Sequence, residues 1–368
     1  MGHRSTLFRL VVATAATAAT AGLAGCGGGG SGPGDTPVVV PPVVVSCPSG
    51  ALASGAASGT FSVAGHSDRD YDLQLPANHV CGTPIAVVFV FHGGGGNRSI
   101  GKRTTCPNGD TSSATCIDRV ALAAGMAVVF ADGTKVPGSD VLSPGGIRTW
   151  NAGGGINGHI CVSGNACNNG VDDMAYVRAL VTSVGTHLRV DPKRIFGTGF
   201  SNGAALTHRL ACQASDLFAA VAPISGANQF ALVNGGCTPA RPVAVLDIHG
   251  TADGCWPYAG GTGGCFDSGL YVSVPTTIAD WATRNACGPA TSTALPLIAP
   301  SDGTSVIRTN YAGCAVGGKL QHLQIVGGGH HWPRGTSFSV TGNSGGVQSQ
   351  QLDASQAVID WFAAHGRP

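Results

Sequence analysis

The residues best suited to chemistry in this sequence are a serine, an aspartate and a pair of histidines that follow strand-like runs. Ser201 stands in the run G-F-S-N-G, after strand-like residues 194–197 and before residues 204–212, which have helical spacing. This G-x-S-x-G pattern predicts a strained turn that exposes the serine hydroxyl as a nucleophile, because glycines there remove Cβ atoms that would clash. A chain with 58 glycines can produce the pattern by chance, so the assignment of Ser201 as nucleophile depends on the residues that would act with it.

Each candidate partner follows an apolar run of the kind that buried parallel strands show. Three such runs lead into turns: residues 85–91 into the glycine loop 92–97, residues 242–248 toward Asp253, and residues 320–326 toward His330. Because the carboxyl ends of parallel strands meet at one edge of a sheet, we expect these turns beside Ser201. The chain order Ser, Asp, His predicts a triad of Ser201, Asp253 and His330.

Seven ordered segments carry a resemblance to a known family. They are residues 91–97, 148–151, 171–173, 189–194, 199–204, 249–253 and 328–333. Together they resemble the polyhydroxybutyrate depolymerase/feruloyl esterase family of secreted α/β-hydrolases, over most of the chain from about residue 60. The chain departs from the family at His331, where members often have a small residue, and at Cys255 and Trp256 in the loop after the aspartate. These departures bear on substrate preference rather than on the chemistry.

The resemblance implies ester hydrolysis through an acyl-enzyme, with no cofactor and no metal. His330 would accept the proton of Ser201 during attack, and Asp253 would hold the histidine tautomer and stabilise the imidazolium. The developing oxyanion needs preorganised donors, for which we expect the N–H groups of Asn202 and, in the glycine loop, Gly94.

His331 competes with His330 for the role of base, because the two histidines are adjacent. His330 is preferred, since the family histidine directly follows the glycines. His331 is then expected to be a polar neighbour that lines the cleft.

Strand-like runs alternate with helical ones, which predicts the α/β class with a mainly parallel central sheet and helices on both faces. The order Ser, Asp, His and the family resemblance imply that this is an α/β-hydrolase fold. Further strands are expected at residues 126–131 and 219–224, and helices at residues 171–188 and 351–365. Asp172 and Asp173 are expected to cap and complement the N-terminus of the first of these helices rather than to act in catalysis.

The first residues have the pattern of an export signal. His3, Arg4 and Arg9 precede an Ala/Thr/Val-rich stretch that is too short and too weakly apolar for a membrane span, and residues 1–26 end in L-A-G-C. This ending resembles a bacterial lipobox, in which Cys26 would be acylated and would hold the protein at a membrane surface. Ordinary cleavage with full release is the alternative.

Residues 27–45 are Gly, Ser, Pro and Val with almost no charge, which is the composition of a tether. Residues 46–368 have a normal length for one catalytic α/β-hydrolase domain, and we find no internal repeat and no second module. We therefore expect an exported protein, extracellular or on the outer surface of a bacterium.

Cysteine usage supports export. Of 13 cysteines, 12 remain when Cys26 is set aside, and an even number favours disulfides in an oxidising compartment. Short separations suggest the pairs Cys106–Cys116, Cys161–Cys167 and Cys255–Cys265, while chain order and the family resemblance suggest Cys47–Cys81, Cys212–Cys237 and Cys287–Cys314. A metal site is the alternative, but the chain has no C-x-x-C pair and its histidines lack zinc spacing.

Charge narrows the choice of partners. Lys and Arg number 20 against 19 Asp and Glu, for a formal net charge of +1, and no basic run occurs. Nucleic-acid binding has no support, and no protein partner is implied. The expected partner is an ester substrate, with membrane contact only through a lipid on Cys26.

The substrate is less determined than the chemistry. Side chains expected near it are Trp150, Trp256, Tyr258, His331 and Trp332, with the glycine-rich residues 151–170 as a rim. Aromatic rings would suit a feruloyl group or an apolar polyester, although each ring can equally be a core anchor. The resemblance favours a 3-hydroxybutyrate polyester or oligoester, with a feruloyl or acetyl-xylan ester as the alternative.

Three other functions remain open. An acyltransferase would use the same triad with an alcohol in place of water, and a peptidase on this fold would attack amides. A surface-bound binding protein would need no catalysis, and it is disfavoured because the expected nucleophile, acid, base and oxyanion loop are all intact.

Overall fold

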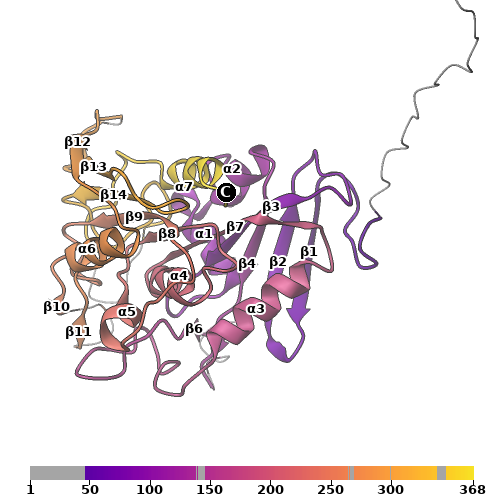
Figure 1. The fold of residues 1–368 in the computed structure, drawn as a ribbon, viewed down its shortest axis with the longest axis horizontal. Helices are drawn as coiled ribbons and strands as arrows, with labels where there is room; N and C mark the ends of the chain where they lie inside the picture. The colour runs from indigo at the N-terminus through magenta and orange to yellow at the C-terminus, as the bar shows by residue number, and fades with distance from the viewer. Residues whose placement is uncertain are drawn as a thin grey trace, which may run out of the picture. The chain divides into compact units, whose positions relative to one another are not determined.

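A ten-stranded sheet forms the centre of the protein in the computed structural model (Figure 1). The structure describes residues 46–368 except 138, 140–145, 264, 266–268, 299 and 338–344. The strands of this sheet are β1 (Ala57–Val63), β2 (His66–Leu75), β3 (Ile85–Phe91), β4 (Ala127–Ala131), β7 (Val190–Phe200), β8 (Ala220–Ile224), β9 (Ala244–Gly250), β12 (Ala290–Ala294), β13 (Ser305–Tyr311) and β14 (Lys319–Val326).

Two short pairs of strands lie outside the central sheet: β5 (Thr134–Lys135) with β6 (Arg148–Thr149), and β10 (Gly261–Thr262) with β11 (Leu270–Tyr271). The helices are α1 (Arg98–Thr104), α2 (Ile117–Ala123), α3 (Asp173–Val184), α4 (Asn202–Gln213), α5 (Gln229–Val233), α6 (Val274–Arg284) and α7 (Ala354–Ala364), with a short 3₁₀ turn η1 at Pro107–Gly109.

The strand order is β1-β2-β4-β3-β7-β8-β9-β14-β13-β12. The six strands from β4 to β14 in this order pair in parallel. The two strands at each edge pair antiparallel with their neighbours. The expected α/β-hydrolase fold with a mainly parallel sheet is therefore confirmed, and all the strands that should carry the site lie in its parallel centre.

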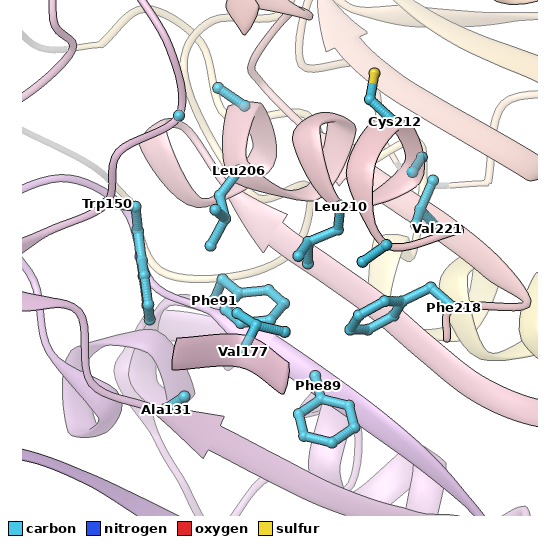
Figure 2. Packing of buried hydrophobic residues seen from close by; sticks show 14 of the residues in the cluster. Phe89, Phe91, Ala131, Trp150, Val177, Leu206, Leu210, Cys212, Phe218 and Val221 are labelled. Atoms are coloured by element: carbon cyan, nitrogen blue, oxygen red, sulfur yellow. The ribbon is translucent and has the colours of Figure 1, made fainter. Parts of the chain in front are cut away.

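Both faces of the sheet are covered, as the continuous burial of β3 requires. Odd-numbered residues of β3, such as Phe89 and Phe91, face the core beneath α3, α4 and α6. Even-numbered residues, such as Val88, face the core beneath α2 and α7. Figure 2 shows Leu206 and Leu210 of α4 packing toward Phe91, with Trp150 beside them.

The first expected helix is shorter than the sequence indicated, and its two aspartates differ in role. Asp172 is the N-cap of α3, and its carboxylate accepts the N–H of Ala175 at 2.9 Å, as expected for a cap. Asp173 is buried and pairs with Arg69 of β2, with 2.7 Å between nitrogen and oxygen. Neither aspartate lies in the triad.

Six disulfides join the pairs that the sequence suggested. Cys255–Cys265 follows the candidate catalytic aspartate, and Cys161–Cys167 closes part of the glycine-rich rim. Within the described part of the chain, no helix is both long and apolar enough to cross a membrane.

Candidate active site

Ser201 occupies the turn between β7 and α4 with φ 56° and ψ −118°, a left-handed conformation that is unusual for a residue with a side chain. A Cβ on Gly199 would lie 2.5 Å from the carbonyl oxygen of Gly203 and 2.8 Å from that of Phe91. A Cβ on Gly203 would meet the carbonyl oxygens of Phe91 and His92 at less than 3.0 Å. The turn therefore needs glycine at both positions, as the motif predicts.

Asp253 and His330 reach the same edge of the sheet from β9 and β14. These strands follow β7 and β8 across the sheet and run parallel to them, so their carboxyl ends lie next to Ser201. The Nδ1–H of His330 donates to Oδ2 of Asp253 at 2.8 Å. The other carboxylate oxygen accepts the N–H groups of Cys255 at 2.9 Å and Trp256 at 2.7 Å.

The carboxylate of Asp253 is held in its charged form. Burial alone would raise its pKa, but the charge and hydrogen bond of His330, with the N–H of Trp256, outweigh burial and lower it below its usual value. An ionised acceptor at Nδ1 fixes the His330 tautomer, so that the other nitrogen, Nε2, is the one suited to exchange a proton.

His330 lies against the nucleophile turn. Its ring packs on Phe200, the residue before Ser201, with 4.8 Å between ring centroids. Ser201 keeps 7% of its surface exposed and His330 only 1%, so both side chains are largely shielded from solvent.

His331 points elsewhere. Its Nε2 lies 2.9 Å from the carbonyl oxygen of Gly346, and its own carbonyl accepts the hydroxyl of Ser225 at 3.1 Å. Burial lowers the pKa of His331. The hydrogen bond to Asp253 distinguishes His330 from its neighbour, which supports the choice of His330 as base.

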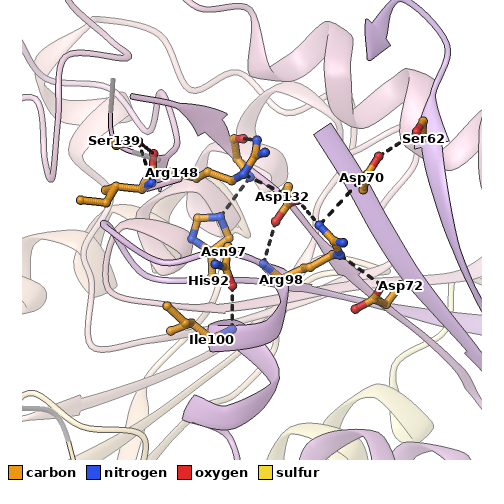
Figure 3. Close-up of polar contacts among 12 residues, drawn as sticks. Ser62, Asp70, Asp72, His92, Asn97, Arg98, Ile100, Asp132, Ser139 and Arg148 are labelled. Atoms are coloured by element: carbon orange, nitrogen blue, oxygen red, sulfur yellow. Dashed lines mark hydrogen bonds and ion pairs between the residues drawn. The ribbon is translucent and has the colours of Figure 1, made fainter. Parts of the chain in front are cut away.

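The glycine loop after β3 is anchored at both ends (Figure 3). At its start, Nε2 of His92 accepts the N–H of Gly133 at 3.0 Å. At its end, Asn97 caps α1, and Arg98 pairs with the buried Asp132 at 2.5 Å. In between, the N–H of Gly95 donates to the carbonyl of Arg148 at 2.9 Å. These contacts hold the loop beside Ser201.

The two expected oxyanion donors have backbone N–H groups that are not used within the described part of the fold. Asn202 is the first residue of α4, where a helix leaves its N–H without an intrahelical partner. No hydrogen bond to the described residues occupies the N–H of Asn202 or that of Gly94. Gly93, the residue before Gly94, lies next to the turn, since a Cβ on it would be 3.5 Å from Cβ of Ser201.

The three tryptophans expected near the substrate are buried, each at 1% exposure or less. The indole N–H of Trp150 donates to the carbonyl of His92, that of Trp256 to the carbonyl of Val272, and that of Trp332 to the hydroxyl of Ser355. Figure 2 shows Trp150 lying within the core. This burial favours the core-anchor alternative for all three rings.

A cluster of buried polar residues under the site was not expected from the sequence. Asp247 of β9 pairs with Nδ1 of His322 at 2.8 Å, and Nε2 of His322 lies 3.0 Å from the hydroxyl of Tyr258. His249 is fully buried, with Nε2 3.8 Å from Oδ2 of Asp253. The alternation of Asp247 and His249 along an apolar strand was the one signal that could have pointed to this cluster.

Two groups of side chains in the described residues approach each other as metal ligands do: Cys106, Cys116 and Asp118; and Asp253, Cys255 and His330. Every cysteine in them belongs to a disulfide, so no thiolate is offered. The candidate lipidation site Cys26, with the rest of residues 1–45, lies outside the described residues.

Comparison with known proteins identifies relatives over about half of the chain. No protein-family model matches. Feruloyl esterase B of Piromyces equi is 29% identical over 217 residues, which are 58% of this chain and 35% of that protein. A probable feruloyl esterase C of Aspergillus clavatus is 32% identical over 174 residues, 47% of this chain and 55% of that protein. This chain resembles the feruloyl esterases. The resemblance expected from the motifs is thus confirmed. The match spans 35% of the first relative's length and 55% of the second's.

Among solved structures, the acetyl xylan esterase from Aspergillus awamori matches with a TM-score of 0.48 and 15% identity, over 83% of this chain and 99% of that one. A likeness at this level carries no argument of its own. The strand order and the serine turn between β7 and α4 are those of an α/β-hydrolase fold.

Proposed function

We propose that this protein is an exported serine esterase that cleaves carboxylic esters through Ser201, His330 and Asp253. The observation that carries the proposal is the hydrogen bond between His330 and Asp253 at the sheet edge where the strained turn presents Ser201. Sequence similarity to feruloyl esterases supports it independently.

In the proposed mechanism each of these residues has a role. Ser201 attacks the carbonyl carbon while Nε2 of His330 takes its proton, and the charged carboxylate of Asp253 stabilises the imidazolium. The oxyanion forms next to the N–H groups of Gly94 and Asn202. His330 then protonates the leaving alcohol, and water cleaves the acyl-enzyme with the same histidine as base.

For the substrate we propose a phenolic ester of the feruloyl type, because several relatives of this chain are named for it. The polyester favoured by the motif resemblance has no comparable support among these relatives. No described residue separates the two, so a direct assay must decide.

We also propose that residues 1–26 direct export and that Cys26 carries a lipid, with residues 27–45 as the tether and residues 46–368 as the catalytic domain. Six disulfides support an oxidising compartment. Mass spectrometry of a native membrane fraction tests the anchor: an acylated Cys26 at the new N-terminus supports it, and absence of the lipid rejects it.

The test of the activity compares wild type with Ser201→Ala on methyl ferulate and on amorphous poly(3-hydroxybutyrate), with products followed by chromatography. We expect ferulate release by wild type only, and labelling of wild type but not of the variant by an active-site phosphonate. Release of 3-hydroxybutyrate oligomers alone would return the assignment to a polyester depolymerase. Failure of wild type to react with ester or phosphonate would reject the esterase and favour a binding protein.

A further inference from the structure

The side chain of Asn202 is fully buried and uses all of its hydrogen-bonding capacity. Its Oδ1 accepts the backbone N–H of Trp150 at 2.8 Å and the hydroxyl of Thr149 at 3.2 Å. Its Nδ2 donates to the carbonyl oxygens of Trp150 at 3.0 Å and Val162 at 3.2 Å. Because a backbone N–H and two backbone carbonyls meet the amide, its orientation is fixed.

These bonds join three parts of the chain that are distant in sequence. The amide ties the end of β6 at Thr149 and Trp150, and the rim segment at Val162, to the first residue of α4. The rim segment is also closed by Cys161–Cys167. Asn202 is therefore the point at which both loops are attached to the nucleophile turn.

The rim segment lies directly over the oxyanion loop. A Cβ on Gly94 would collide with Cβ and Oγ of Ser163, the residue after Val162. Ser163 itself has φ 63°, so the rim bends sharply where it meets the loop. Next to Ser163, the carbonyl of Val162 accepts the Nδ2–H of Asn202 at 3.2 Å and the hydroxyl of Thr149 at 3.5 Å.

We infer that Asn202 is a positioning residue for the oxyanion pocket: its side chain fixes the rim segment at Val162 and Ser163 over Gly94 and so sets the space for the carbonyl oxygen. This inference rests on the proposed esterase activity. It goes beyond the role expected of Asn202 from the sequence, which concerned only its backbone N–H, a group that every substitution except proline retains.

The chain offers a matched control at the amino ends of the central strands, opposite the end that carries the site. Asn285 is also fully buried. Its amide accepts the N–H of Val243 at 3.2 Å and donates to the carbonyls of Val243 at 2.7 Å and Lys319 at 3.2 Å. Val243 precedes β9 and Lys319 begins β14, so this amide joins the amino ends of the strands whose carboxyl ends carry Asp253 and His330.

The experiment compares Asn202→Ala with Asn285→Ala in the full chain, measuring melting temperature, kcat and KM on methyl ferulate, and inhibition by a trifluoromethyl ketone that forms an oxyanion on Ser201. Both variants should lose similar stability. Only Asn202→Ala should lose about 10- to 100-fold in kcat, the scale expected for small displacements of catalytic groups, with KM little changed. Its affinity for the ketone should fall by a similar factor, while product ferulate binds as before.

Equal kinetic losses in the two variants, or an Asn202→Ala enzyme within twofold of wild type, would overturn the inference and leave the esterase standing. A wild type without esterase activity would reject the proposed function, and the inference with it. If Asn202→Ala fails to fold, Thr149→Val serves instead. It removes the hydroxyl that donates to Oδ1 of Asn202 and keeps the shape of the side chain at position 149. That variant should show a smaller loss of kcat in the same direction, and an unchanged kcat would count against the positioning role.

Discussion

Acid should weaken the fold through the buried imidazole of His92, which supports the oxyanion loop. Its Nδ1 lies 2.7 Å from the carbonyl of Gly93, and its Nε2 accepts the N–H of Gly133 at 3.0 Å. A proton on Nε2 would point at the N–H of Gly133, so that two donors would face each other. Burial accordingly lowers the pKa of His92 from 6.5 to about 4, although the backbone of Gly93 and the nearby Asp132 oppose the change.

The sign follows from proton binding. Between pH 6.5 and about 4 the unfolded chain binds a proton at His92 that the folded chain excludes, so the free energy of unfolding falls as the pH falls through this window. The contribution is fully present above pH 6.5. Its size is about 3 kcal/mol, from about 1.4 kcal/mol for each pKa unit between the two values.

The assay is denaturant unfolding at pH 7, 6, 5 and 4, with wild type beside His92→Gln. The glutamine can accept the N–H of Gly133 but does not titrate. We expect the variant's unfolding free energy to fall by about 3 kcal/mol less than that of wild type over this range. Parallel curves for the two proteins would refute the argument that His92 is held neutral by the fold.

Further predictions concern the base, the turn and a buried ion pair. His330→Ala should lose at least about 10³-fold in kcat while His331→Ala stays active, and the reverse kinetic result would reassign the base. Gly203→Ala should lower the free energy of unfolding by about 1–3 kcal/mol, because its Cβ would meet two backbone carbonyls. A denaturant unfolding curve that matches wild type would contradict this geometry. Arg69→Met should cost about 3–5 kcal/mol by leaving Asp173 charged and buried, and the double variant with Asp173→Leu should recover part of that loss if the pair behaves as described.

Local rules made the central strands and the serine turn predictable. The seven residues of β3 are apolar and buried on both faces, and a run of this kind predicts a central strand. The outer strands lacked this signal. Every residue of β12 is exposed, and β2 mixes charged and apolar residues, so the antiparallel edges of the sheet did not stand out.

Side-chain roles near the site were harder to predict than its location. Trp150 lies close to the expected pocket in sequence, yet it is buried in the core with its N–H on the carbonyl of His92. Asp247 and His322 are 75 residues apart and meet only because β9 and β14 are neighbours in the sheet. Periodicity cannot report such pairs, since it carries no information on which strands become adjacent.

The sequence by itself determined the chemistry available to this protein: a serine in a turn that only glycines permit, followed in order by an aspartate and a histidine after apolar strands. These features are local, because sterics within a few residues and alternation along a strand create them. Tertiary structure alone decided that Asp253 bonds His330 rather than His331, that the tryptophans face the core, and that the Asn202 side chain binds two loops. Asp253 and His330 are 77 positions apart, and Asn202 and Val162 are 40 apart, so these contacts exist only in the folded chain.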